Sequence, residues 1–298
     1  MSPLGPVLAV TDFSAPARHA ADRAARLARE THSPLTLMHV LQGNSLQTLR
    51  QWLGSDNTLE AQLHEDAQRQ LLALAADLEA HRHLKPEVLN ASGSVTDEII
   101  QAADRMDAGL LVLGARGTGF LRRMVLGSTS ERLLRRTKRP LLVVRQTPHE
   151  PYRRVLVALD FSPWSAHAIA LARRVAPHAK LLLFNAYQVP FEEKLRFAGV
   201  DTATIDLYRR HAQAEAQQRV QALARSSGLT PPEWEACVVE GDASLRLLEL
   251  EQEHGCDLVV LGKHGQSVTE DLLLGSVSKH VLAEGGCDVL VSTAHEAP

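Results

Sequence analysis

The sequence predicts an α/β protein of two tandem repeats, each an open, Rossmann-like sheet of five parallel strands with helices on both faces. The glycine pattern Gly-x2-Gly-x9-Gly-Ser occurs twice, and the second copy follows the first by 148 residues in a chain of 298. Short apolar runs alternate with longer amphipathic segments in each half, which is the order of strand and helix in such a sheet. Several runs are apolar at every position, as expected for parallel strands buried on both faces.

The first half supplies five strands and four helices in alternation. Val7 to Thr11 is an apolar run, and Ser14 is well placed to cap a helix over Ala15 to Glu30, because a serine hydroxyl accepts from the first free backbone amides. The remaining elements are expected, in chain order, at Leu35 to Leu41, Leu59 to Arg82, Pro86 to Ala91, Val95 to Met106, Leu110 to Leu113, Ser128 to Thr137 and Leu141 to Val144.

The second half repeats this order, and Ser162 is placed to cap its first helix as Ser14 does. Its strands are expected at Val155 to Leu159, Leu181 to Phe184, Glu235 to Val239, Leu258 to Leu261 and Val289 to Val291. Its helices are expected near Pro163 to Val175, Ala203 to Ser226, Ala243 to Glu253 and Gly275 to Glu284. Gln42 to Asn57 and Gln188 to Thr202 lack clear periodicity and are predicted as loops with partial helix. The polar stretch Gln146 to Pro151 contains two prolines and separates domains predicted at residues 1–147 and 152–298.

Composition excludes several classes of protein. An apolar share of 45% with 22% charged residues describes a globular chain, and a net charge of −3 disfavours nucleic-acid binding. No apolar run approaches the length of a membrane span, and the first ten residues do not resemble a secretory signal. The three cysteines form no Cys-x-x-Cys pair and indicate reduced thiols, so a cytoplasmic location is predicted. The 14 histidines show no zinc-ligand spacing, and no metal site is predicted.

Three loops in each half are predicted to meet at the carboxyl ends of the strands, where ligands bind in open parallel sheets. They contain Asp12 or Asp160 after the first strand, Val40 or Ala186 at the end of the second, and the glycine pattern after the fourth. A carboxylate accepts hydrogen bonds from ribose hydroxyls, whereas glycines before a helix start let backbone N–H groups approach a phosphate. Each aspartate could instead cap its helix and each glycine form a turn, but their duplication in register favours ligand contact.

This arrangement resembles the universal stress protein family, in its tandem form and its ATP-binding branch. The resemblance covers the whole chain and matches the motif in full twice, with Gly127-Ser128-Thr129 and Gly275-Ser276-Val277 at the two ends. It implies that ATP, with Mg²⁺, is bound in each repeat, and Ala186 departs from the valine that is usual at its position. The residues implied are Asp12, Val40, Gly114, Arg116, Gly117, Gly127, Ser128, Thr129, Asp160, Ala186, Gly262, His264, Gly265, Gly275, Ser276 and Val277.

Binding without fast turnover is predicted, because the chain has no P-loop lysine and no Gly-x-Ser-x-Gly elbow. Slow ATP hydrolysis or autophosphorylation is the most activity expected, and no catalytic residue is assigned. The function that follows is a stress-response sensor or regulator that works through nucleotide occupancy. The alternative is a chaperone-like or protein-interaction module of the same fold that does not depend on nucleotide.

The two halves are expected to differ in charge and to contact each other. The first glycine loop contains Arg116, Arg122 and Arg123, whereas in the second loop Lys263 and His264 are expected to face Glu270 and Asp271. The first site is therefore hypothesised to bind triphosphate more tightly, although exposed loop charges are largely screened. Both fifth strands are apolar, and a bare apolar edge strand pairs readily. Universal stress proteins dimerise through this strand, so the resemblance implies a pseudo-dimer within the chain, with a further homodimer as an option.

Overall fold

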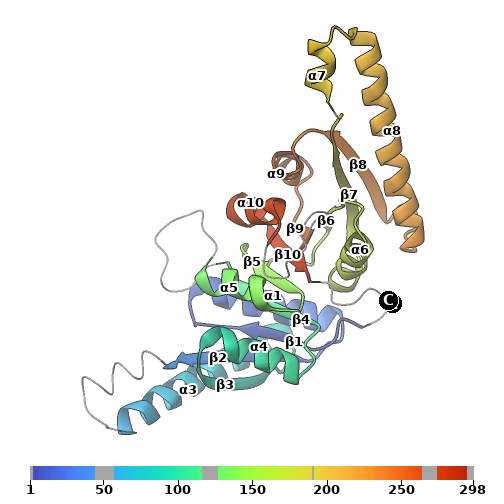
Figure 1. Ribbon diagram of the computed structural model, residues 1–298. Helices are drawn as coiled ribbons and strands as arrows, with labels where there is room; N and C mark the ends of the chain where they lie inside the picture. The colour runs from blue at the N-terminus through green and yellow to red at the C-terminus, as the bar shows by residue number, and fades with distance from the viewer. Residues whose placement is uncertain (1–2, 44–56, 116–126, 190, 264–273, 294–298) are drawn as a thin grey trace.

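The computed structural model describes residues 3–43, 57–115, 127–189, 191–263 and 274–293, and their strands form one ten-stranded sheet (Figure 1). Its order is β3-β2-β1-β4-β5-β10-β9-β6-β7-β8. The strands are β1 (Val7–Val10), β2 (Leu35–Gln42), β3 (Glu87–Gly93), β4 (Leu110–Gly114), β5 (Leu141–Val144), β6 (Arg154–Ala158), β7 (Lys180–Tyr187), β8 (Trp234–Glu240), β9 (Leu258–Gly262) and β10 (Asp288–Ser292). The two predicted α/β repeats are therefore present, and their sheets are continuous.

The repeats meet where β5 pairs with β10, and this pair is antiparallel, whereas the other neighbouring strands of the described chain are parallel. Leu142 lies opposite Leu290, and Val143 lies opposite Val289. All four side chains are fully buried. The predicted contact between the fifth strands is present, and it removes the apolar edge that either repeat would otherwise expose.

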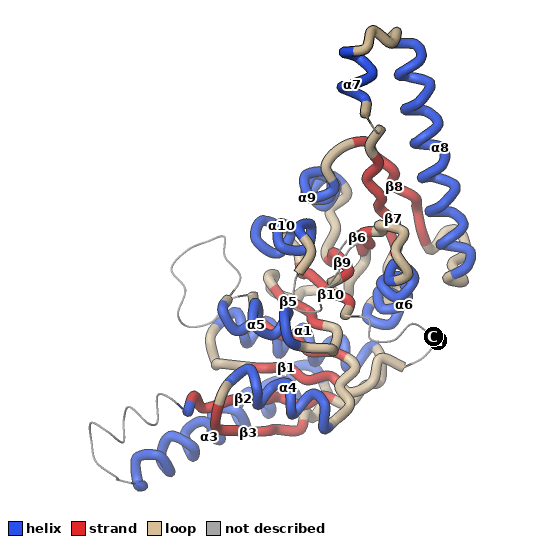
Figure 2. Tube along the Cα trace, viewed as in Figure 1, coloured by secondary structure: helices blue, strands red, loops and turns tan. Residues whose placement is uncertain are grey.

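Eight helices of the described chain cover the sheet in two layers (Figure 2). On one face lie α1 (Ala15–Glu30), α3 (Asn57–Arg82), α6 (Trp164–Val175) and α8 (Thr202–Ser226). On the other lie α4 (Val95–Arg105), α5 (Ser128–Arg136), α9 (Ala243–Glu253) and α10 (Ser276–Glu284). Side chains alternate between the faces along each strand, so Leu110 and Val112 pack under α1 whereas Leu111 packs in the opposite layer.

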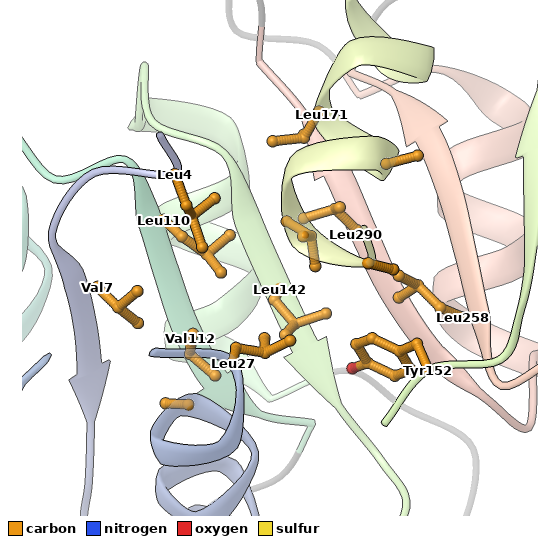
Figure 3. Packing of buried hydrophobic residues seen from close by; sticks show 14 of the residues in the cluster. Leu4, Val7, Leu27, Leu110, Val112, Leu142, Tyr152, Leu171, Leu258 and Leu290 are labelled. Carbon is orange, nitrogen blue, oxygen red and sulfur yellow. The ribbon is translucent and has the colours of Figure 1, made fainter. Parts of the chain in front are cut away.

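Each layer has a core that runs through both repeats. In the α1 and α6 layer, Leu142 and Leu290 contact the same hydrophobic cluster as Leu110 and Leu258, with Tyr152 beside them (Figure 3). Because these residues come from both halves, unfolding one repeat would expose apolar surface of the other. The chain is therefore expected to unfold with strong coupling between its repeats.

The starts of the two first helices differ from the prediction. Ser14 caps α1 as expected, since its hydroxyl accepts a hydrogen bond from the Ala17 amide. Ser162 does not cap α6: Pro163 occupies the N-cap position with helical backbone angles, and the Ser162 hydroxyl donates to Asp160 instead. The prediction for Ser162 is wrong because proline shifts the helix start one residue further along the chain.

The two segments without periodicity have different outcomes. Residues 188–202 contain the short helix α7 (Glu192–Phe197), in agreement with a loop that is partly helical. Residues 44–56 lie outside the described residues. In Figure 1, α7 and the beginning of α8 project beyond the end of the sheet.

The buried cysteines lead to a first testable prediction. Burial raises the pKa of the Cys256 thiol to about 12 and that of Cys287 well above its usual value, whereas Cys237 is only half-buried. Because thiolate is the reactive form, iodoacetamide at about pH 8 is expected to label Cys237 first and to reach the other two only after unfolding. Peptide mass spectrometry of native and urea-treated protein measures this order. Labelling of Cys256 as fast as Cys237 in native protein would contradict it.

Candidate functional site

The order of strands reverses twice, between β1 and β4 in the first repeat and between β6 and β9 in the second. Asp12 follows β1, and Asp160 follows β6. The neighbouring strands β4 and β9 end at Gly114 and Gly262. In each repeat the predicted acid and the predicted glycine loop therefore leave adjacent strands at the reversal, which is the usual ligand position in such sheets.

Each aspartate supports a tight turn after its strand. Asp12 Oδ1 accepts from the Ser14 amide and hydroxyl, and Asp160 Oδ1 accepts from the Ser162 amide and hydroxyl. The residue between them, Phe13 or Phe161, has a φ of 64° or 61°, in the left-handed region. Ser165 adds a third hydrogen bond to Asp160 at 2.9 Å. Oδ1 of each aspartate therefore stabilises the turn. The turn in return holds each carboxylate at the carboxyl ends of the strands.

The ends of the second strands correspond in the two repeats. His39 Nδ1 lies 2.8 Å from the Thr11 carbonyl oxygen, and the Asn185 amide donates to the Leu159 carbonyl at the same distance. The following residue, Val40 or Ala186, faces the α5 and α10 layer of the core. His39 and Asn185 fasten the second strand to the loop that carries the aspartate, a task that sequence spacing did not assign to them.

In both repeats a backbone hydrogen bond joins the beginning of the glycine loop to its end. The Gly127 amide donates to the Ala115 carbonyl at 3.0 Å, and the Gly275 amide donates to the Lys263 carbonyl at 3.1 Å. Gly127 and Gly275 are the N-cap residues of α5 and α10, and neither helix has a capping side chain. Within the described residues no side chain caps these first turns, and the amide groups of an uncapped first turn suit an anion.

Other predicted members of the glycine motifs have mixed outcomes. Ser128 and Ser276 are the exposed first residues of α5 and α10, followed by Thr129 and Val277. A Cβ on Gly114 would lie 2.9 Å from the backbone of Pro16, so the close packing of α1 requires this glycine independently of any ligand. Arg116, Gly117, His264 and Gly265 lie outside the described residues, and their roles stay predictions.

A cavity of about 580 Å³ lies at the carboxyl ends of the strands of the second repeat. It brings together six of the predicted residues: Asp160, Ala186, Gly262, Gly275, Ser276 and Val277. Its apolar wall includes Ala158, Phe184 and Leu261. This volume falls within the usual range for small-molecule sites, about 300–1,000 Å³.

Several cavity residues were missed at the sequence level. Trp164 begins α6 beside the aspartate turn, and Glu215 and Arg219 reach the cavity from α8. The guanidinium carbon of Arg219 lies 4.0 Å from the centre of the Phe161 ring. A glutamate and an arginine four residues apart were visible in the sequence, but such pairs are common on solvated helix faces.

Lys263 contacts the first repeat. Its ammonium group reaches across to the first repeat and donates to the carbonyl oxygens of Arg135 and Thr137 at 3.1 and 3.3 Å, at the end of α5. The side chain is buried, and a cation is favourable at the carboxyl end of a helix. The lysine therefore joins the two repeats. The acidic residues that it is expected to face, Glu270 and Asp271, lie outside the described residues, and that expectation stays a prediction.

The described residues contain neither a membrane-spanning helix nor a cluster of metal-ligating side chains. No helix there is both long and apolar enough to span a bilayer. Histidine, cysteine, aspartate and glutamate side chains there form no cluster of three or more that would suit a metal ion.

The fold and the loops at the two strand reversals define a tandem-repeat α/β protein. The chain belongs to the universal stress protein family, whose family model matches residues 4–145 and 151–293. The match covers both repeats, so the predicted family is confirmed and includes the tandem form.

Relatives with this family name share about 30% of their residues with the chain. A Mycobacterium tuberculosis universal stress protein, Rv2005c, is 31% identical over 191 residues, which is 62% of each protein's length. A universal stress protein of Mycolicibacterium smegmatis is 29% identical over 96% of both chains. The crystal structure of a universal stress protein from Archaeoglobus fulgidus covers 98% of both chains with a TM-score of 0.70 at 20% identity, which supports the fold.

Proposed function

We propose that this protein binds ATP with Mg²⁺ and acts in the stress response as a sensor or regulator through nucleotide occupancy. The observation that carries the proposal is the second-repeat cavity, which collects residues from all three predicted loops in one space. Membership of the universal stress protein family supplies the link to stress response. The sixteen residues implied by the resemblance are proposed as the two ATP sites.

The residues of the cavity suit the parts of an adenine nucleotide. The first turn of α10 and the hydroxyl of Ser276 would hold phosphate oxygens. The apolar wall at Phe184 and Ala186 would cover the base, and the Asp160 carboxylate, which lines the same cavity, would accept from the ribose hydroxyls. Mg²⁺ would neutralise the phosphates and keep most of its water, since it is usually bound by phosphates and few protein ligands.

Little or no turnover is part of the proposal. Among the described residues that line the cavity, Arg219 is the one basic side chain, and it stacks on Phe161. Fast phosphoryl transfer relies on several cationic groups around the transferring phosphate. Phosphate release from ATP is therefore expected at no more than a slow rate, which a coupled phosphate assay measures.

The direct test is a titration of the purified protein with ATP and Mg²⁺, read by calorimetry and by the fluorescence of Trp164 in the cavity wall. Asp160→Ala is expected to weaken ATP binding at the second repeat about tenfold or more, because a hydrogen bond to a charged group is lost. Asp12→Ala tests the first repeat in the same way. The hypothesis of a tighter first site predicts the larger loss from Asp12→Ala.

Protein denatured directly after purification provides the second readout. Release of adenine nucleotide would support the proposal, and neither release nor binding in the titration would overturn it. Gln218→Ala is the matched control, because Gln218 is an exposed residue of α8 outside the cavity lining.

The alternative function, a chaperone-like or protein-interaction module, is favoured by a separate observation. Phe191, Phe197, Leu207 and Tyr208 are exposed on α7 and the beginning of α8, the part that projects from the sheet (Figure 1). Exposed apolar side chains gathered in one place are typical of contact surfaces. If no nucleotide binds, this module becomes the better description of the protein.

We also propose the remaining organisation from the sequence. The domain division at residues 1–147 and 152–298, a cytoplasmic location and a pseudo-dimer of repeats belong to this proposal, and so does further homodimerisation. The antiparallel pairing of β5 with β10 supports the pseudo-dimer. Sedimentation of the purified chain measures whether two copies associate.

A further inference from the structure

The inner wall of α8 carries a carboxylate and a guanidinium that the proposed ATP site does not yet use. Glu215 and Arg219 are one helical turn apart, and both line the second-repeat cavity. Within the described part of the chain, neither side chain has a hydrogen bond or an ion pair. An acceptor and a donor therefore line the same space without hydrogen-bond or ion-pair partners among the described residues.

The position of Arg219 is set by its contact with Phe161. The guanidinium carbon lies over the ring, 4.0 Å from its centre, which is a favourable cation–π contact. Phe161 itself is held in the turn closed by Asp160 and Ser162. The arginine is thus positioned by the same turn that carries the predicted ribose acceptor, and it lines the cavity.

The charge of the pair indicates which part of a ligand it contacts. Glu215 offsets the charge of Arg219, so this wall adds no net positive charge and a phosphate there would meet a carboxylate. The uncapped amides that favour phosphate belong to α10, which packs on the opposite face of the sheet from α8. The base, which Phe184 and Ala186 would cover, is the uncharged part of such a ligand, and its edge is the part that could reach toward α8.

We infer that Glu215 and Arg219 recognise the edge of the purine base and give the second repeat its preference for adenine. This inference rests on the proposed nucleotide site. An adenine edge offers an N6 amino donor beside a ring-nitrogen acceptor, and a carboxylate with a guanidinium matches it. Hypoxanthine, which has an oxygen in place of the amino group, offers Glu215 no such donor.

The test compares ATP, inosine triphosphate and adenosine, read by Trp164 fluorescence in the same cavity and by calorimetry. Wild-type protein is expected to bind ATP about tenfold or more tightly than inosine triphosphate, and Glu215→Ala to remove most of that difference. Arg219→Leu is expected to weaken ATP and adenosine by the same factor, since the base is common to both. Gln218→Ala is expected to change none of these constants.

Two results would overturn the inference while leaving the proposed ATP site intact. One is ATP binding by wild type with unchanged base preference in both variants, which would make the Arg219 contact with Phe161 a surface feature only. The other is loss of ATP affinity in Arg219→Leu with adenosine unaffected, which would assign the arginine to phosphate. Failure of wild type to bind any of the three ligands would overturn the proposed function itself.

Discussion

Asp288→Ala is expected to destabilise the protein by about 3–5 kcal/mol, the usual cost of removing one partner from a buried charge pair. Asp288 is fully buried at the start of β10. Its carboxylate accepts from the Tyr152 hydroxyl at 2.6 Å and from the Arg145 and Gln146 amides, and it lies 3.4 Å from Arg23 Nε. The substitution would leave a buried guanidinium and two linker amides without this acceptor.

The Asp288 cluster joins the repeats. Arg23 belongs to α1 of the first repeat, stacks 4.1 Å over Tyr152 and donates to the Glu150 carbonyl. Burial raises the pKa of Tyr152 well above its usual value, so the phenol stays a donor to Asp288 at every ordinary pH. The linker is therefore fixed between α1 and β10, and its loss is expected to affect both repeats.

Urea unfolding, followed by circular dichroism, measures the effect on the free energy of unfolding. Asp66→Ala is the control: Asp66 pairs with Arg69 on the exposed side of α3, and exposed pairs contribute about 0–1 kcal/mol. Asp288→Asn keeps the size and one acceptor and is expected to lose less than Asp288→Ala. If Asp288→Ala and Asp66→Ala lowered the free energy of unfolding by equal and small amounts, the Asp288 cluster would not be what holds the two repeats together.

The sequence predicted the elements closely because both of its signals are local. Apolar runs and glycine spacing located the strands, and the prediction for α9 matches its observed bounds, Ala243–Glu253. The same shift of 148 residues aligned Asp12 with Asp160 and the two glycine motifs. Those residues lie at strand ends, so their positions follow from the repeat alone.

The shift failed where the copies have diverged. Pro163 moved the start of α6, and Lys263, whose counterpart is Ala115, crosses to the other repeat. Asp288 stands where the first repeat has Pro140, and its partners are more than a hundred residues away in the chain. Contacts between the repeats depend on the pairing of β5 with β10. The hydrophobic periodicity of the sequence does not identify residue pairs that are this far apart in the chain.

The cavity wall on α8 could not be predicted for a related reason. An exposed glutamate and arginine one turn apart look like a solvated helix face in any sequence. Only the packing of α8 beside the aspartate turn turns them toward a ligand site. The residues that we infer to read the base therefore required the structure, whereas the proposed phosphate and ribose contacts did not.

Gly109→Ala is the second substitution with a large expected effect, a destabilisation of roughly 3 kcal/mol or more, because overpacking against backbone has no cheap relief. A Cβ on Gly109 would lie 1.7 Å from the Leu4 carbonyl oxygen, and Leu4 is buried in the core. The Gly109 amide donates to the Pro6 carbonyl at 2.8 Å. The alanine would separate the entry to β1 from the entry to β4.

These two strands flank the reversal at which the first site is proposed. Gly109→Ala therefore tests whether the close approach of β1 and β4 stabilises this part of the sheet. Gly255→Ala is the matched control, since Gly255 has a φ of 57° with open space around it, and alanine there is expected to cost about 1 kcal/mol. Urea unfolding of both variants separates close contact from backbone strain. A loss in Gly109→Ala no greater than in Gly255→Ala would mean that the Leu4 segment withdraws freely, and the spacing of β1 and β4 would then need another explanation.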